Sequence, residues 1–148
     1  MPRQLVLRAT LRAAAPVLDE DPLAGALRET HEEIGIHPDE VRIIGALSPL
    51  WVIVSNFLVR PFVGIVDHRP DFRAEPREVA ALLEAPVSAV RDQSLIGWDE
   101  RVRDGVLIRY PYFTIAGHRV WGATAMMLSE FSEVVSGTTG TTVPSALA

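Results

Sequence analysis

The stretch Arg28-Glu29-Thr30-His31-Glu32-Glu33-Ile34-Gly35-Ile36, preceded by Glu20, carries the strongest signal in this 148-residue chain. Glu29, Glu32 and Glu33 stand at positions i, i+3 and i+4, so a helix places their side chains on one face. Like charges at this spacing repel, and each pair weakens a helix by roughly a few tenths of a kcal/mol. Hard divalent cations such as Mg²⁺ and Mn²⁺ prefer oxygen ligands of this kind. The pattern therefore predicts a helix face that holds a metal ion.

The flanking residues predict the helix independently of its charges. Asp21 is a suitable N-cap, Pro22 suits the first helical position, and Gly35 suits the position just past the end. Residues at three- and four-residue steps form an apolar stripe that leaves the glutamates on another side: Leu23, Ala26, Leu27, Thr30 and Ile34. Arg28, four residues before Glu32, can neutralise and orient that carboxylate. The alternative is a solvated face whose Arg–Glu pair contributes little.

The complete pattern resembles the Nudix box, the signature of Nudix hydrolases, which reads G-x5-E-x7-R-E-U-x-E-E-x-G-U with U a bulky apolar residue. Glu20 fills the first glutamate position, Arg28-Glu29 the R-E pair and Glu32-Glu33 the E-E pair. The chain departs from the box at two positions. Ala14 stands where the leading glycine belongs, and Thr30 stands where an aliphatic residue is usual.

This resemblance implies a Nudix-type α/β/α sandwich with a mixed sheet, in which the box binds a divalent metal. Glu29, Glu32 and Glu33 would be the ligands of Mg²⁺ or Mn²⁺, and Glu29 is also a candidate base. Arg28 would orient the glutamates, and Glu20 would support them from the preceding loop. Metal-assisted attack of water on a pyrophosphate is the chemistry that such residues serve.

Further stretches look like the coenzyme A pyrophosphatase branch of the superfamily, so that the likeness covers about residues 19–135. They are Val41–Leu50, Arg60–Val66, Ala74–Val79, Glu84–Val87, Tyr110–Phe113 and His118–Ala125. The implied reaction is hydrolysis of CoA or acyl-CoA to 4′-phosphopantetheine, or its acyl form, and 3′,5′-ADP. By the same resemblance Glu78 is a candidate for a further acidic group.

Some residues outside the box have both a functional and a structural interpretation. Arg119 can bind a substrate phosphate bidentately, or it can bond a carbonyl or carboxylate of the fold. Four aromatic residues can stack on an adenine, although packing in the core is their usual role: Trp51, Tyr112, Phe113 and Trp121.

Residues 1–18 differ from the CoA pyrophosphatase branch. They contain no glycine, and they lack the glycine-rich CoA-associated motif that precedes the box in that branch. A truncated or misread start and a divergent end both explain this difference. Two alternatives to CoA hydrolysis therefore stay open. The chain can act on another nucleoside diphosphate derivative, or it can be a Nudix-like domain that binds a nucleotide without turning it over.

Composition predicts one compact domain and excludes several function classes. The chain is 48% hydrophobic, and its longest apolar region, Leu47–Val66, is broken by polar residues and prolines, so no membrane span is expected. Cysteine is absent, which excludes thiolate chemistry and is compatible with a reducing cytoplasm. The net charge of −5 argues against general nucleic-acid binding. The partner expected is a small nucleoside diphosphate, and the oligomeric state is open, with a homodimer among the options.

Alternating hydrophobic and turn-forming stretches predict an α/β fold. The predicted domains are residues 1–18 as a separate segment, 19–135 as the Nudix domain and 136–148 as a disordered tail. Residues 5–11 are either a strand or the start of a helix. Helices are expected at 21–34, 86–91 and 121–135, and strands at 41–47, 51–66 with a break near 55–56 or 60–61, 78–83, 105–109 and 112–115.

Overall fold

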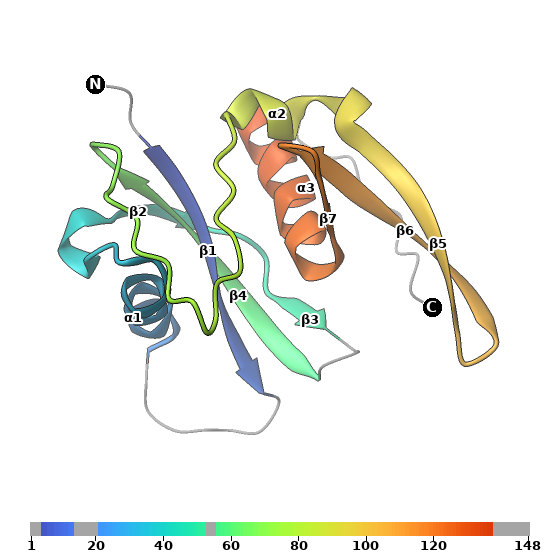
Figure 1. Ribbon diagram of the computed structural model, residues 1–148, viewed down its shortest axis with the longest axis horizontal. Helices are drawn as coiled ribbons and strands as arrows, with labels where there is room; N and C mark the ends of the chain where they lie inside the picture. Colours follow the sequence, from blue (N-terminus) through green and yellow to red (C-terminus); the bar gives the residue numbers. More distant parts are fainter. Residues whose placement is uncertain (1–3, 14–20, 53–55, 138–148) are drawn as a thin grey trace. The chain divides into compact units, whose positions relative to one another are not determined.

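The computed structural model describes residues 4–13, 21–52 and 56–137, with the backbone alone for 4–13 (Figure 1). The chain divides into two compact units, Met1–Leu83 and Glu84–Ala148. The first unit contains β1 (Gln4–Ala13), α1 (Pro22–Ile34), the 3₁₀ turn η1 (Pro38–Glu40), β2 (Arg42–Ala46), β3 (Leu50–Val52) and β4 (Phe57–Val66). The second contains α2 (Val87–Arg91), the 3₁₀ turn η2 (Gln93–Leu95), β5 (Ile96–Arg103), β6 (Val106–Ile115), β7 (His118–Trp121) and α3 (Gly122–Ser136).

Strand β4 is the centre of the first unit's sheet. β1 pairs with it in antiparallel orientation along its whole length, from Gln4 opposite Val66 to Ala13 opposite Phe57. β2 and β3 pair with the other edge of β4. The segment 5–11, which sequence left undecided, is therefore a strand, and part of residues 1–18 belongs to this sheet. The boundary predicted between residues 18 and 19 stays a prediction.

Pro61 lies in the middle of β4 without breaking it, and the pairing pattern explains why. A proline has no N–H to donate to a neighbouring strand. On the β2–β3 side, Leu50 of β3 pairs with Val59 and Ala46 of β2 pairs with Phe62, so the ladder is interrupted at Pro61. The Pro61 carbonyl still accepts a hydrogen bond from Leu47 N–H at 3.0 Å. Of the two predicted breaks, the one near residues 55–56 is correct, because β4 begins at Phe57.

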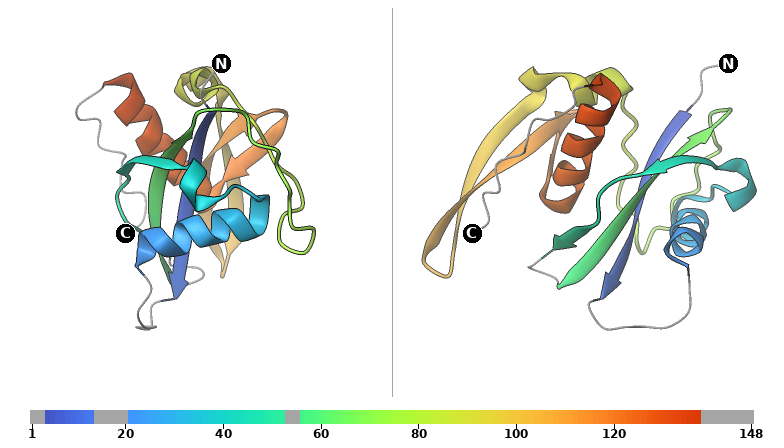
Figure 2. Two further views of the ribbon diagram at one scale, coloured as in Figure 1. Left: turned by 90° about the vertical axis from the view of Figure 1, so that its left-hand side faces the viewer. Right: turned by 180° about the vertical axis from the view of Figure 1, so that it is seen from behind.

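Helix α1 matches its predicted bounds, and Figure 2 shows it lying across one face of the sheet. Pro22 is its first residue, and Gly35 ends it in the left-handed conformation with φ 78°. Asp21 occupies the N-cap position, but its side chain makes no capping hydrogen bond. The predicted apolar stripe faces the sheet, with Ala26, Thr30 and Ile34 buried. Thr30 is accommodated there because its hydroxyl donates to the Ala26 carbonyl at 2.7 Å.

The segment after β4 covers the end of α1 instead of adding a strand. The backbone N–H groups of Arg73 and Glu75 donate to the carbonyls of Ile34 and Glu33, at 3.0 and 2.8 Å. A helix leaves its last four carbonyls without partners within the helix, and this segment supplies partners to two residues there. Its apolar side chains, with Val41, pack against the buried residues Ile34, Ile36 and Val66: they are Phe72, Val79 and Leu82.

The strand predicted at 78–83 is therefore wrong. A turn that begins at Glu75 ends there, with the N–H groups of Glu78 and Val79 donating to the Glu75 carbonyl at 3.1 and 2.8 Å, and irregular chain follows. Val79 and Leu82 are apolar because they pack on the core cluster, not because they alternate across a sheet. The spacing of apolar residues in this short segment suits both a strand and an irregular segment packed on the core, so the spacing alone did not distinguish them.

The second unit is a three-stranded antiparallel sheet with α3 against one face. β5 and β6 form a hairpin whose turn, Asp104–Gly105, has positive φ at both residues, as a type I′ hairpin turn requires. The predicted hairpin lay further along the chain, at 105–109 and 112–115. Those two strands are one continuous strand, β6, and β5 was missed because its polar and apolar residues alternate weakly. The helices predicted at 86–91 and 121–135 are confirmed within a residue by α2 and α3.

The α/β class is confirmed, with helices packed on two sheets. Every strand pair within these sheets is antiparallel, so the described residues include no parallel pair of the kind that a mixed sheet contains. The tail predicted at 136–148 lies almost wholly outside the described residues. No helix in the described part of the chain is long and apolar enough to cross a membrane.

Gly35→Ala tests the junction between α1 and the segment that caps it. A Cβ at Gly35 would lie 3.0 Å from the Arg73 Cβ, and φ of 78° is unfavourable for alanine. We expect the free energy of unfolding to fall by about 1–2 kcal/mol, measured by urea denaturation. Gly45→Ala is the matched control, because no atom lies within 4 Å of a Cβ there. Equal stability of the two variants would contradict this account of the junction.

Candidate active site

Arg28 and Glu32 form an ion pair on the exposed side of α1. The Arg28 Nη1 donates to the Glu32 Oε2 at 2.7 Å, across one helical turn. Their side chains are 48% and 57% exposed, so solvent screens the pair and its contribution to stability is at most about 1 kcal/mol. The contact therefore does more to fix the direction of the Glu32 carboxylate than to stabilise the helix.

Glu29 and Glu33 are half-buried and stand one helical turn apart, and Glu32 directly precedes Glu33 in the chain. The helix thus keeps all three carboxylates on neighbouring positions of one surface, away from the buried Ala26, Thr30 and Ile34. Oxygen donors at this spacing are chemically suited to a hard divalent cation.

The capping segment brings more acidic residues to this helix end. The Glu75 N–H bonds the carbonyl of Glu33, and Glu78 follows in the turn whose first residue is Glu75. The Glu75 Oε1 accepts a hydrogen bond from Arg77 N–H at 3.3 Å, which braces the turn. Glu78 was the acidic residue singled out by sequence, and the fold places both it and Glu75 near the box.

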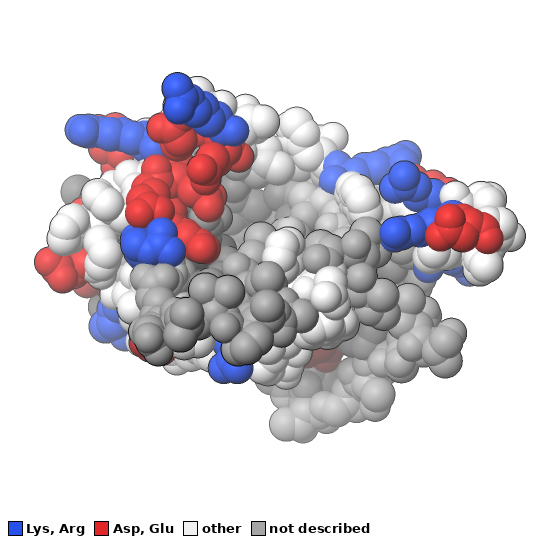
Figure 3. Space-filling model, turned by 90° about the horizontal axis from the view of Figure 1, so that it is seen from below, with Lys and Arg blue, Asp and Glu red and all other residues white. Residues whose placement is uncertain are grey.

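The surface view agrees with this arrangement. Figure 3 shows Asp and Glu side chains gathered on the side of the molecule where α1 lies, with arginines at the margin of the patch. An acidic patch with an arginine margin attracts cations to its centre and still offers positive groups to an anion beside it.

The described side chains do not form a preformed metal-binding site. Within residues 21–52 and 56–137, no group of three or more His, Asp or Glu side chains is arranged to hold a metal ion. Mg²⁺ usually takes one or two carboxylates and completes its shell with water and substrate phosphates. The donor set of α1 therefore fits an ion held partly by substrate, and does not fit an ion held by the protein alone.

Three further residues were singled out from the sequence. Glu20 and Ala14 lie outside the described residues. Arg119 belongs to the second unit, where its Nη1 donates to Asp99 Oδ2 at 2.8 Å. The bond to a carboxylate of the fold, which was one of its two interpretations, is thus present.

The contact between Glu33 and Glu75 was not predicted. The two residues are far apart in the chain, and no spacing rule links them. Gly35 marks the end of the helix, where carbonyls lack partners within the helix, but it does not identify the segment that bonds them.

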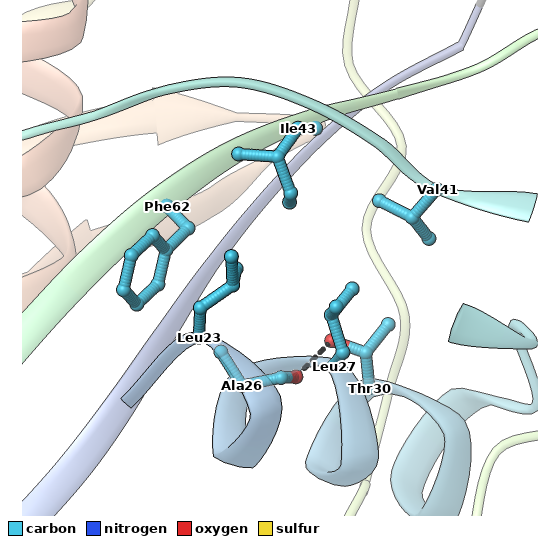
Figure 4. A pocket seen from close by; sticks show the side chains of 8 residues that line it. Leu23, Ala26, Leu27, Thr30, Val41, Ile43 and Phe62 are labelled. Atoms are coloured by element: carbon cyan, nitrogen blue, oxygen red, sulfur yellow. Dashed lines mark hydrogen bonds between the residues drawn. The ribbon is translucent and has the colours of Figure 1, made fainter. Parts of the chain in front are cut away.

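A small cavity lies on the opposite side of α1, between its apolar stripe and the sheet (Figure 4). Its volume is about 10 Å³, close to the space that one water needs, so it is a packing gap and not a ligand site. The lining residues are Leu23, Ala26, Leu27, Thr30, Val41, Ile43, Phe62 and Gly64.

Comparison with known proteins gives relatives along most of the chain, although no family model matches it. The uncharacterised Nudix hydrolase NudL of Photorhabdus laumondii is 31% identical over 117 residues, which are 79% of this chain and 62% of that protein. NudL of Enterobacter sp. strain 638 is 38% identical over 122 residues, 77% of this chain and 59% of that protein. NudL of Yersinia enterocolitica is 32% identical over 118 residues, 80% and 60% respectively.

The chain thus spans about three fifths of the length of the curated relatives it matches. Their printed names give the superfamily and no substrate. They support the resemblance drawn from Arg28-Glu29 and Glu32-Glu33: this chain is similar in sequence to Nudix hydrolases of the NudL kind.

Proposed function

We propose that this chain is a divalent-metal-dependent pyrophosphohydrolase whose substrate is coenzyme A or an acyl-CoA. The observation that carries the proposal is the acidic surface of α1, in which Arg28 fixes Glu32 beside Glu29 and Glu33. Relatives named Nudix hydrolases support the hydrolysis of a nucleoside diphosphate. The CoA assignment depends on the stretches that resemble the CoA pyrophosphatase branch, above all Tyr110–Phe113 and His118–Ala125.

The roles proposed for the residues come from the resemblance to the Nudix box. Glu29, Glu32 and Glu33 would supply carboxylate oxygens for Mg²⁺ or Mn²⁺, and Glu29 is the candidate base for the attacking water. Arg28 holds Glu32 in its direction by the 2.7 Å contact. Glu78 and Glu20 are proposed as supporting carboxylates. A bound ion would neutralise charge on the pyrophosphate and acidify water.

The reaction adds one water across one phosphoanhydride. The water oxygen forms a bond to one phosphorus, and the bond from that phosphorus to the bridging oxygen breaks. The bridging oxygen leaves with the other phosphate, so the products from CoA are 4′-phosphopantetheine and 3′,5′-ADP. Location in a reducing cytoplasm and a homodimeric state stay predictions from the sequence.

A substrate panel tests the proposal. Purified protein is incubated with CoA, acetyl-CoA, a nucleoside diphosphate sugar and a dinucleoside polyphosphate, with Mg²⁺, with Mn²⁺ and with excess chelator. We expect turnover of the CoA compounds that the chelator abolishes. In Glu32→Gln we expect turnover to fall by about 100-fold or more. Loss of a residue that only orients a metal ligand costs roughly 10- to 100-fold, and loss of the ligand itself should cost at least as much.

Glu100→Gln is the control, since it removes an exposed carboxylate of the second unit. Faster turnover of another diphosphate would replace the CoA assignment. Binding of CoA without turnover of any compound would refute hydrolysis.

Arg28→Met separates a role in positioning from a role in stability. The ion pair with Glu32 is about half exposed, so the free energy of unfolding should change by less than about 1 kcal/mol. Turnover should nevertheless fall by roughly 10- to 100-fold, with a higher metal concentration needed for half-maximal rate. Arg42→Met, an exposed arginine outside the box, is the control. Unchanged turnover and metal dependence in Arg28→Met would remove Arg28 from the proposal.

A further inference from the structure

The sheet of the second unit has one covered face and one open face. Phe113 and Ile115 of β6 are buried on the side where α3 packs, and Ala125 and Phe131 of α3 are buried with them. Side chains alternate between the two faces along a strand, so Tyr112 and Thr114 lie on the face opposite to α3.

The strand pairing gives the composition of the open face. Tyr112 pairs with Gly97 on β5 and with Trp121 on β7, and directly paired residues share a face. Continuing in steps of two, this face carries three arginines, one aspartate and three aromatic rings, together with Thr114 and the exposed apolar residues Val106 and Ile108. We call it the aromatic–arginine face: Asp99, Arg101, Arg103, Tyr110, Tyr112, Arg119 and Trp121.

Contacts within the face hold two of its side chains in place. The Arg119 guanidinium lies 4.7 Å from the centre of the Tyr112 ring and bonds Asp99 at 2.8 Å. The Tyr112 ring also lies over Gly97, where an added Cβ would overlap the ring. Arg119 and Tyr112 are thus ordered before any ligand arrives, which lowers the entropy lost on binding.

Trp121 remains open beside this pair. Its ring lies 5.6 Å from that of Tyr110, with 44° between the planes, and its side chain is 55% exposed. A large aromatic ring left in water costs free energy and is common where a ring of a ligand stacks. Asp99 is the single acidic residue of the face and pairs with Arg119, and Asp104 of the adjoining turn lies 3.8 Å from Arg103. Because the face carries three arginines, it is still net positive in a chain of net charge −5.

Flat rings beside arginines suit a ligand that is itself flat and anionic. Arginine binds phosphate oxygens bidentately, and aromatic rings stack on nucleobases with little dependence on the base. The acidic character of the whole chain disfavours a long polyanion such as RNA, whose other phosphates would meet negative surface. A mononucleotide satisfies both the rings and the charge.

We propose that the aromatic–arginine face binds a purine mononucleotide, with the base stacked on Trp121 and a phosphate on the arginines led by Arg119. This binding is independent of the hydrolysis proposed for α1, because it uses residues of the second unit alone. It gives a function to Trp121 and Arg119 that the fold by itself does not require.

The test compares two tryptophans on opposite faces of the same sheet. Trp98 and Trp121 are both 55% exposed, and Trp98 has its own arginine, Arg109, at 4.9 Å from its ring. Calorimetric titration of the intact chain with 3′,5′-ADP should give measurable binding, which Trp121→Ala weakens by roughly 5- to 150-fold. Trp98→Ala should leave the dissociation constant within about twofold.

A second pair of variants tests the charge. Arg119→Gln should weaken 3′,5′-ADP binding and leave adenosine binding within about twofold, whereas Arg109→Gln should change neither. Inorganic pyrophosphate should bind more weakly than 3′,5′-ADP, because it lacks a base. Glu32→Gln should keep full nucleotide binding even where it abolishes hydrolysis, so the two proposals can fail separately.

Three results would overturn the proposal: no binding of 3′,5′-ADP, equal losses in the two tryptophan variants, or tighter binding of an adenine oligonucleotide than of the mononucleotide. The last would indicate a nucleic-acid surface.

Discussion

The candidate site depends on two backbone hydrogen bonds that close the end of α1. Carbonyls at the end of a helix need partners from elsewhere, and here Arg73 and Glu75 provide them to Ile34 and Glu33. The same segment sends Phe72, Val79 and Leu82 onto the cluster of Ile34, Ile36 and Val66. One irregular segment therefore bonds the last carbonyls of α1, packs apolar side chains on the core and brings acidic residues close to the box. The acidic surface is consequently anchored at its least stable point, the last turn of the helix.

Sequence predicted the parts of this arrangement that are local. The cap positions at Pro22 and Gly35 and the apolar stripe of α1 depend on neighbours within four residues, and the structure contains them. The ion pair of Arg28 with Glu32 is local in the same sense. The segment after β4 was misread because Val79 and Leu82 pack on a core assembled from distant residues. The direction of Arg119 could not be foreseen either, since Asp99 reaches it only through strand pairing.

The box carries an electrostatic cost that one ion pair reduces. Three negative groups within about one turn of a helix repel one another, and a neighbouring arginine offsets part of that repulsion. Arg28 does this through its 2.7 Å contact with Glu32, and Glu29 and Glu33 are half-buried. A bound cation would offset the repulsion further.

The pairing pattern of β4 bears on how the chain acquires its structure. β1 meets β4 from about fifty positions earlier in the sequence, as the register of Gln4 with Val66 and of Ala13 with Phe57 requires. Strands β5, β6 and β7 are joined by turns of two residues and meet only their immediate neighbours. Local pairing forms fast, whereas distant pairing must first close a long loop and is slower. During folding, the C-terminal hairpins would therefore form before β1 pairs with β4. Until then, β4 would expose an unpaired edge.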